Sequence, residues 1–412
     1  MPSKDLDFFL CICIIHFINI NMMLWGAVAL LLLWTAEWRR EEVALVWWTS
    51  GFPGTSQRRH CGGGVQCMVY SEGAAAYGGH VSGYLFYGSN IDFGRLPVPR
   101  KRGVMWALYH EESPRNAEEL MHESALGLFN VSATFSRDSD VPFTLQYLDS
   151  MSDLTTMRYY VPTADKNEYL ERLAPIIYLQ SDCETATERD AFVRELMKFI
   201  PVDSYGACVN NARLPDKFKN DYLNNLNESE FLEFVARYKF TIAIENGVCD
   251  DYVTEKLWRA IKVGSVPIYY GAPNVRDWLP NDASAILLQE HGTVARLADH
   301  LRALLADDRA YEAHLEHKLL SRVTNAQLAN ELHRRPWAAD ALDVAARLEC
   351  ELCEALHART RRVVTAAHYR CPAPRSALTL DVRAGNDWVR SWRTAGLNAD
   401  TIRGKVLEAS EV

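Results

Sequence analysis

The sequence lacks several signatures that would assign it to a common class of protein. Its 44 lysines and arginines are outnumbered by 53 aspartates and glutamates, which gives a net charge of −9, and no basic stripe carries interleaved aromatics. This balance argues against nucleic acid as a partner, although one or two local cations would suffice to bind a diphosphate. There is no internal repeat, no Gly-x-Ser-x-Gly motif and no Gly-x-Gly-x-x-Gly after a strand. The stretch Gly78–Gly83 also lacks the Gly-Lys-Ser/Thr ending of a P-loop.

Signals for a bound metal are also sparse. Cys350 and Cys353 form the single Cys-x-x-Cys, and no second such pair or spaced histidine pair completes a zinc site. His314 and His317 lie three residues apart without a third ligand nearby, so we expect both at the surface. Asp138-Ser139-Asp140 is an Asp-x-Asp tripeptide, which chance alone supplies in so acidic a chain, and we interpret it as a solvated turn. The sequence therefore predicts no metal site.

An uncharged, largely apolar segment lies near the amino terminus. No formally charged residue occurs from 8 to 36, and a helix of about 20 apolar residues spans a bilayer. We interpret 1–40 as an uncleaved signal-anchor; a cleaved signal peptide is the alternative, although the Trp-Thr-Ala at 34–36 is a poor cleavage site. Basic residues flank the segment on both sides, which leaves its orientation open. Sequons at Asn130 and Asn227 fit a lumenal body that carries N-linked glycans.

The ten cysteines include two close pairs, Cys61/Cys67 and Cys350/Cys353. In an oxidising lumen these pairs are disulfide candidates, whereas in the cytosol a Cys-x-x-Cys could serve redox or metal chemistry. We expect disulfides, with Cys350 and Cys353 within bonding reach of each other.

Apolar runs and helical patterns alternate along the chain. The expected buried strands are Val43–Trp48, Tyr84–Tyr87, Val104–Leu108, Ile176–Gln180, Phe240–Glu245 and Val266–Tyr270, with helices at 188–199 and 253–263. This alternation predicts an α/β protein with two domains and parallel sheets. Beyond about residue 335 the chain is helical to Tyr369, and the tail after Pro372 has little periodicity.

One candidate site follows the strand at 240–245. This strand delivers Glu245 and Asn246 at its carboxyl end, where α/β sheets place ligands. Asp250 and Asp251 are plausible N-caps of the next helix, so Lys256 falls in its first turn. A cation there opposes the helix dipole by up to about 1 kcal/mol.

An anion bound at this helix start would make the position of Lys256 favourable, because the backbone N–H groups and the ammonium would both face it. The alternative is that Asp250, Asp251 and Glu255 merely neutralise Lys256 in a solvated turn. Spacing alone leaves both interpretations open.

A second candidate site is Tyr109–Pro114. Ser113 as N-cap and Pro114 at the first helical position would make an ordinary helix start. Alternatively, Glu112 at the carboxyl end of a strand could accept a proton from a hydroxyl.

Longer motifs give these residues a family resemblance. Tyr238–Pro280 resembles the donor signature of the α-1,3-fucosyltransferases, glycosyltransferase family 10, with FxxxxEN at 240–246, DYVTEK at 251–256 and Gly-x-Val-Pro-Ile at 264–268. WALYHEESP at 106–114 and Arg-Asp-Ser-Asp at 137–140 are similar to further landmarks of that family. The resemblance covers about residues 80–335.

The resemblance implies a GT-B architecture, two Rossmann-like domains facing a cleft, and inverting transfer from GDP-β-L-fucose without an essential metal or cofactor. It implies that Glu112 is the general base and that Arg137 contacts substrate in a role that the motif does not fix. The implied donor-binding residues are Arg189, Glu245, Asn246, Tyr252, Glu255 and Lys256. The partners are then GDP-fucose, a glycan or protein acceptor, and a membrane.

The sequence departs from the Lewis-type enzymes after Asn246, where it has Gly-Val-Cys-Asp. With HEESP and NVRDWLP, this resembles a divergent branch proposed to fucosylate protein hydroxyls or N-glycan cores in the endoplasmic reticulum, so the acceptor stays open between an α-1,3 linkage to GlcNAc and a Ser/Thr hydroxyl. A secretory-pathway pseudoenzyme that acts as a binding protein is the alternative. We expect a single-pass type II protein of the Golgi or endoplasmic reticulum with a lumenal catalytic domain. The predicted domains are 41–170 on the acceptor side, 171–335 for GDP-fucose, and a helical extension over 336–412.

Overall fold

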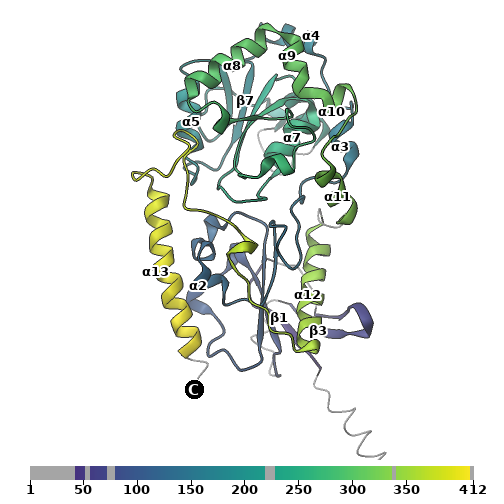
Figure 1. Ribbon diagram of the computed structural model, residues 1–412, viewed down its shortest axis with the longest axis vertical. Coiled ribbons are helices and arrows are strands. Elements are labelled where there is room, and N and C mark those ends of the chain that lie inside the picture. Colours follow the sequence, from purple (N-terminus) through teal and green to yellow (C-terminus); the bar gives the residue numbers. More distant parts are fainter. Residues whose placement is uncertain (1–41, 52–55, 72–78, 219–227, 336–339, 409–412) are drawn as a thin grey trace, which may run out of the picture. The chain divides into compact units, whose positions relative to one another are not determined.

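Two β-sheets form the framework of the chain in the computed structural model, which describes residues 42–51, 56–71, 79–218, 228–335 and 340–408 (Figure 1). From Ala44 onward the chain is one compact unit that contains both sheets. The first sheet has the order β2-β3-β1-β4-β5-β6 and the second the order β11-β10-β9-β7-β8. All strand pairs are parallel except the β2–β3 hairpin. The prediction of an α/β fold with parallel sheets is confirmed.

The strands of the first sheet are β1 (Ala44–Trp47), β2 (Gln57–His60), β3 (Gln66–Tyr70), β4 (Gly83–Tyr87), β5 (Met105–His110) and β6 (Val131–Thr134). Those of the second are β7 (Ile176–Gln180), β8 (Val202–Gly206), β9 (Phe240–Ile244), β10 (Val266–Tyr270) and β11 (Ile286–Leu287). Every residue of β5, β7, β9 and β10 is buried. Their nearly continuous apolar runs are what parallel strands need when helices cover both faces.

The helices are α2 (Glu123–Leu126), α3 (Met151–Thr155), α4 (Thr163–Tyr169), α5 (Arg189–Leu196), α6 (Ser229–Ala236), α7 (Glu255–Val263), α8 (Val294–Ala306), α9 (Asp308–Glu312), α10 (Glu316–Leu319), α11 (Ala326–Arg334), α12 (Ala341–Ala358) and α13 (Asp387–Glu408). α7 packs on β9 and β10 of the second sheet. α12 packs on β5 and β6 of the first sheet, and α13 packs on α2. In Figure 1, α12 (light green) and α13 (yellow) run beside the sheet that contains β1.

The tail after Pro372 has little periodicity in the sequence, yet it forms the 22-residue helix α13, within the region 336–412 that was expected to be a helical extension. Its buried face includes Val389, Ala395, Ala399 and Val406. Alanine contributes little to an apolar pattern, so the period of this face is weak in the sequence even though it is well packed.

The prediction that both histidines at 314 and 317 lie at the surface is wrong for His317. Its side chain is 1% exposed, and burial lowers its pKa to about 3. His314 is partly buried and its Nδ1 lies 2.6 Å from the carbonyl oxygen of Ala283.

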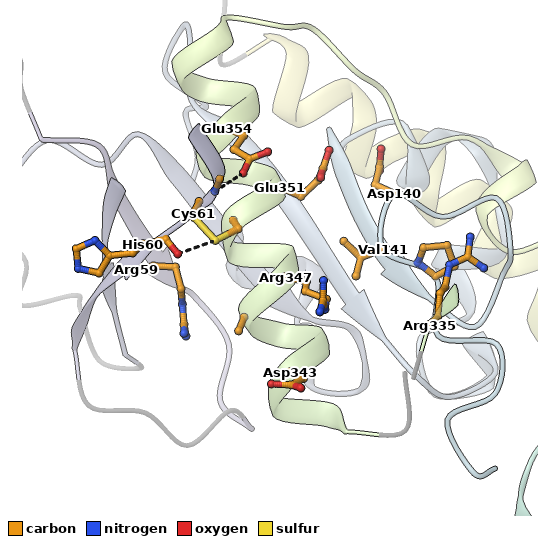
Figure 2. A pocket seen from close by; sticks show the side chains of 14 residues that line it. Arg59, His60, Cys61, Asp140, Val141, Arg335, Asp343, Arg347, Glu351 and Glu354 are labelled. Atoms are coloured by element: carbon orange, nitrogen blue, oxygen red, sulfur yellow. Dashed lines mark hydrogen bonds between the residues drawn. A yellow bond between two sulfur atoms is a disulfide. The ribbon is translucent and has the colours of Figure 1, made fainter. Parts of the chain in front are cut away.

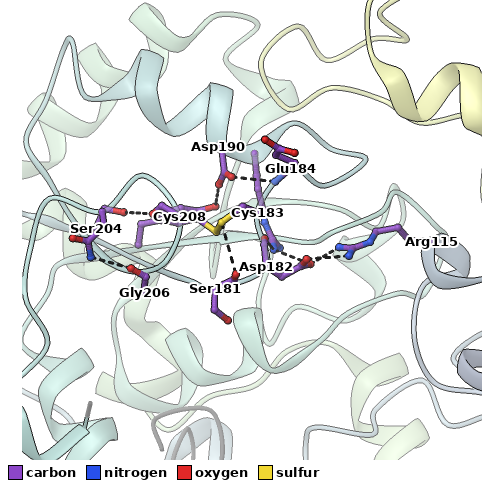
Figure 3. The surroundings of a disulfide bond; sticks show 12 residues. Arg115, Ser181, Asp182, Cys183, Glu184, Asp190, Ser204, Gly206 and Cys208 are labelled. Carbon is purple, nitrogen blue, oxygen red and sulfur yellow. Dashed lines mark hydrogen bonds and ion pairs between the residues drawn. A yellow bond between two sulfur atoms is a disulfide. The ribbon is translucent and has the colours of Figure 1, made fainter. Parts of the chain in front are cut away.

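All four predicted cysteines form disulfides, but the predicted pairing is wrong. Cys61 bonds Cys350 and Cys67 bonds Cys353, so both bonds join the β2–β3 hairpin to α12. Residues three apart on a helix share one face, and here that face meets the hairpin, so each sulfur on α12 has a hairpin sulfur as its nearest partner. Two further disulfides, Cys183–Cys208 (Figure 3) and Cys249–Cys371, were not predicted.

Within the ranges described, no helix combines the length and the apolar character that crossing a membrane requires. The predicted signal-anchor at 1–40 lies outside those ranges.

The two disulfides on α12 close loops of almost equal length, with sequence separations of 289 and 286 residues. By the chain-entropy relation such a loop contributes about 6 kcal/mol, and either bond alone still closes it. Replacing Cys61 and Cys350 by Ser should therefore lower the free energy of unfolding by about 2–3 kcal/mol, because the remaining bond still closes the long loop, whereas replacing all four cysteines should cost about 6–8 kcal/mol. Chemical denaturation of both variants measures the difference. Losses that simply add, or peptide mapping that recovers a Cys61–Cys67 bond, would contradict this arrangement.

Candidate active site

Polar residues at the carboxyl ends of β5 and β9 meet between the two sheets. Glu112 and Ser113 follow β5, and Asn246 follows β9. The Tyr252 hydroxyl donates to Glu112 Oε2 at 2.9 Å, and the Ser113 hydroxyl donates to Asn246 Oδ1 at 2.8 Å. The two candidate sites of the sequence are therefore one site.

Glu245 holds the start of α7 in place by hydrogen bonding to the residue before it. Its carboxylate is fully buried and accepts hydrogen bonds from the Thr254 backbone N–H at 2.8 Å and hydroxyl at 2.7 Å. Burial raises the pKa of Glu245, and the nearby Lys256 offsets this only in part. Gly271 leaves room for this side chain, because a Cβ there would lie 2.5 Å from the Glu245 Cγ.

The predicted N-caps of α7 are wrong. Thr254 caps the helix by accepting from the Lys256 N–H, while Asp251 is buried and binds Arg137. The helix starts at Glu255, so Glu255 and Lys256 do lie in its first turn, as predicted.

Lys256 is surrounded by oxygens. Its Nζ lies 3.0 Å from Thr254 Oγ1, 3.1 Å from Glu255 Oε1 and 3.6 Å from Glu245 Oε2. Burial alone would lower the pKa of Lys256, but Glu255 and Glu245 outweigh it and raise that pKa. The ammonium is thus held charged at the amino end of α7, with Glu245 and Glu255 as its neutralising partners rather than Asp250 and Asp251.

Arg189, the first residue of α5, is 1% exposed at the carboxyl edge of the second sheet. It donates to the carbonyls of Ile244 at 3.2 Å and Asp182 at 2.6 Å, and its Nε is buried without a partner. The Asp182 carboxylate also accepts from Arg115 Nη2 at 2.9 Å (Figure 3). Two guanidinium groups therefore flank Asp182 beside the ends of β7 and β9.

Arg137 makes a structural connection rather than pointing freely into the site. Its guanidinium pairs with Asp251 at 2.6 Å and Asp277 at 2.7 Å, and it lies 4.5 Å from the ring centroid of Trp278. The residue is thus engaged by the segment after β9 and by the loop after β10.

The two residues that precede Glu112 in the sequence are less suited to proton transfer. His110 is fully buried with Nδ1 2.8 Å from the Tyr369 hydroxyl, and burial lowers its pKa to about 3. Glu111 accepts from the Tyr87 hydroxyl, and burial raises the pKa of Glu111.

Sequence reasoning missed Tyr147, which is 37% exposed and follows the turn whose Gln146 donates to the Glu111 carbonyl. Its pKa is raised by desolvation and by the charges of Glu255, Glu112, Glu111 and Glu245. No motif marks this tyrosine, and its position follows from the preceding residue, Gln146, whose side chain bonds the Glu111 carbonyl.

The side chain of the sequon residue Asn130 takes part in hydrogen bonds of the fold. Its amide nitrogen donates to the Arg362 carbonyl at 2.8 Å, its Oδ1 accepts from the Trp106 N–H at 2.9 Å, and Ser132 of the same sequon is fully buried. Asn227 lies outside the described residues.

A pocket of about 590 Å³ lies along α12 beside the Cys61–Cys350 disulfide (Figure 2). Charged side chains of both signs line it, among them Arg59, Asp140 and Asp343. None of the predicted catalytic or donor-binding residues lines it, so it is distinct from the site at Glu112.

Fold and site together define a two-sheet α/β protein in which carboxylates and basic side chains converge at the strand ends. The family description "Glycosyltransferase family 10 (fucosyltransferase) C-term" matches residues 170–369, and "Fucosyltransferase, N-terminal" matches 27–146. The chain belongs to glycosyltransferase family 10, the fucosyltransferases, which confirms the resemblance found in its motifs.

Individual relatives are similar over most of the chain. The human GDP-fucose protein O-fucosyltransferase 3 is 41% identical over 328 residues, which cover 79% of this chain and 68% of the relative. The dog protein of that name is 44% identical over 293 residues, covering 71% of this chain and 61% of the relative. A crystal structure of an α1,3-fucosyltransferase with GDP-fucose aligns with a TM-score of 0.41 and 18% identity, over 66% of this chain and 81% of that one.

The pairing of Glu255 predicts how stability depends on pH. Burial opposes its ionisation, but Lys256 and Arg259 outweigh burial and lower the pKa of Glu255 from 4.5 to about 2. A carboxyl group with a lowered folded-state pKa stabilises the protein fully above its unfolded pKa and loses that contribution as pH falls towards the folded value. Glu255→Gln should therefore flatten the fall in unfolding free energy between about pH 4.5 and 2. Denaturation across that range tests this, and an unchanged slope would count against the ion pair.

Proposed function

We propose that this protein transfers L-fucose from GDP-β-L-fucose, with inversion, to a Ser or Thr hydroxyl of a protein in the secretory pathway. The observation that carries the proposal is the position of Glu112. It follows a strand of the first sheet, yet it is one hydrogen bond away from Tyr252, in the segment that leads from β9 to Lys256. The proposed base, Glu112, thus comes from the first sheet. The positively charged start of α7, with Lys256, follows a strand of the second sheet.

The donor would lie against the second sheet. Lys256 and the amino end of α7 suit a diphosphate, because the ammonium and the helix N–H groups both favour negative charge. Arg189 adds a buried guanidinium at the end of β9. Asn246 and Glu255 stand at the same edge, where they could contact the sugar and ribose hydroxyls. Glu245 holds Thr254 and would act through it rather than by touching the donor.

The chemistry needs one proton transfer and one displacement. The acceptor oxygen attacks the anomeric carbon of fucose as its proton passes to Glu112, and the bond from that carbon to GDP breaks. Negative charge then builds on the leaving diphosphate, where Lys256 and the start of α7 would stabilise it. No step in this scheme uses a metal. The relatives' name favours a protein hydroxyl over GlcNAc as the acceptor.

The proposal includes a GT-B arrangement, with the predicted domains 41–170 and 171–335 supplying the acceptor and donor sides. Four disulfides among the described residues support an oxidising lumen, in the endoplasmic reticulum or Golgi. Anchoring by residues 1–40 is part of the same proposal.

Lys256→Ala should weaken binding of GDP by the full-length protein more than tenfold, because a charge-assisted contact is worth about 1.5–3 kcal/mol. Calorimetry with GDP measures this, and UDP, which should bind the unchanged protein more weakly, is the control ligand. An unchanged dissociation constant would show that Lys256 pairs only with Glu245 and Glu255 and does not contact GDP.

Glu112→Gln keeps the shape of the side chain and removes its basicity. General-base catalysis contributes about 10²–10⁴-fold, so turnover should fall by at least that lower amount while GDP-fucose still binds. The assay uses radiolabelled GDP-fucose and whichever cysteine-rich domain the unchanged protein fucosylates in a panel. Near-normal transfer by the variant would end the assignment and make Glu111 the next residue to test. No transfer by the unchanged protein to any acceptor would instead favour the pseudoenzyme.

A further inference from the structure

The family resemblance implies that Tyr252 is a donor-binding residue, but in the structure its hydroxyl bonds a residue that follows the first sheet's β5 strand. It donates to Glu112 Oε2 at 2.9 Å. Glu112 Oε1 makes no hydrogen bond to any residue in the described ranges. One oxygen of this carboxylate is therefore fixed and the other is left for a substrate proton.

The ring of Tyr252 is itself held rigidly. It is 1% exposed and packs against Phe135 with ring centroids 4.9 Å apart and planes at 58°. Its carbonyl accepts from the Tyr269 hydroxyl at 3.3 Å. Since the ring has no room to turn, the hydroxyl is presented to Glu112 in one place.

The segment 246–252 that carries this tyrosine is fastened to its surroundings on both sides. Cys249 is bonded to Cys371, Asp251 is bound by Arg137, and Asn246 accepts from Ser113. Arg137 and Ser113 belong to loops of the first sheet, which also carries Glu112. The donor-side segment is thus tied to the strand ends that bear the base.

We propose that Tyr252 is a positioning residue for Glu112: a tyrosine of the donor-side segment sets the orientation of the base on the acceptor-side sheet. This inference rests on the proposed role of Glu112. A glutamate side chain has three rotatable bonds, so without this hydrogen bond its carboxylate would sample orientations that do not reach the acceptor oxygen. Tyr252 would then act on turnover and not on donor affinity.

Tyr252→Phe tests this, because it keeps the ring packing on Phe135 and removes only the hydroxyl. The kcat for transfer to the same cysteine-rich domain should fall about 10- to 100-fold, the effect expected for losing a hydrogen bond to a charged group. The dissociation constant for GDP should stay within about twofold of the original. A raised dissociation constant with unchanged kcat would make Tyr252 a donor contact and overturn the proposal, as would no change in either quantity.

The matched control is Tyr238→Phe, which removes a buried hydroxyl that donates to Asp203 at 2.9 Å, among the hydrogen bonds of the second sheet. It should leave kcat unchanged, and melting temperatures of both variants show whether they fold. The double variant with Glu112→Gln separates the two proposals. If Tyr252 acts through Glu112, adding Tyr252→Phe should cost little more than Glu112→Gln alone. Losses that multiply would overturn the positioning role while Glu112 stays the base, and Glu112→Gln without any effect would remove the base itself.

Discussion

The buried carboxylate of Asp251 is the point on which the geometry of the site depends. It is 2% exposed and its backbone has a positive φ of 65°, a conformation that aspartate tolerates better than most residues. Donors from Arg137, Asn274 and Trp278 converge on it. An unpaired carboxylate in such a place would cost several kcal/mol, so the loops that supply these donors must meet there.

The position of Tyr252 follows from that meeting point. Because Asp251 is fixed by an arginine of the first sheet, the next residue along the chain is delivered to Glu112 with little freedom. The same turn leads into Thr254, whose backbone N–H and hydroxyl donate to the Glu245 carboxylate. These hydrogen bonds fix the start of α7 and therefore the position of Lys256 in its first turn. One short stretch of chain therefore positions both Tyr252, which bonds Glu112, and Lys256. At one end of this stretch the buried carboxylate of Asp251 binds the Arg137 guanidinium. At the other end the buried carboxylate of Glu245 accepts hydrogen bonds from Thr254, the N-cap of α7.

The carboxyl-terminal part of the chain stabilises this arrangement from outside. α12 lies on the first sheet and is joined to the β2–β3 hairpin by two disulfides. Before α13, the chain contacts the second sheet's loops, where the Ala377 N–H donates to the Thr187 carbonyl at 2.7 Å and Asn386 donates to the Ala186 carbonyl at 3.0 Å. α13 then packs on α2 of the first sheet. The carboxyl-terminal residues from 340 onward thus contact both the first sheet and the loops of the second sheet. The predicted extension is therefore part of the framework that surrounds the site.

Much of the framework follows from local sequence. The strands Ile176–Gln180 and Val266–Tyr270 were predicted with the bounds that the structure has, because a strand buried on both faces must be a short apolar run. Glu112, Glu255 and Lys256 were found through strand ends, helix spacing and a long motif. What the sequence could not decide were partners distant along the chain. The pairing of Cys67 with Cys353, the joining of Arg137 to Asp251, and the reach of Tyr252 to Glu112 each span more than 100 residues. Such contacts exist only once helices and sheets have packed, because packing, and not local spacing, determines which side chains share a face.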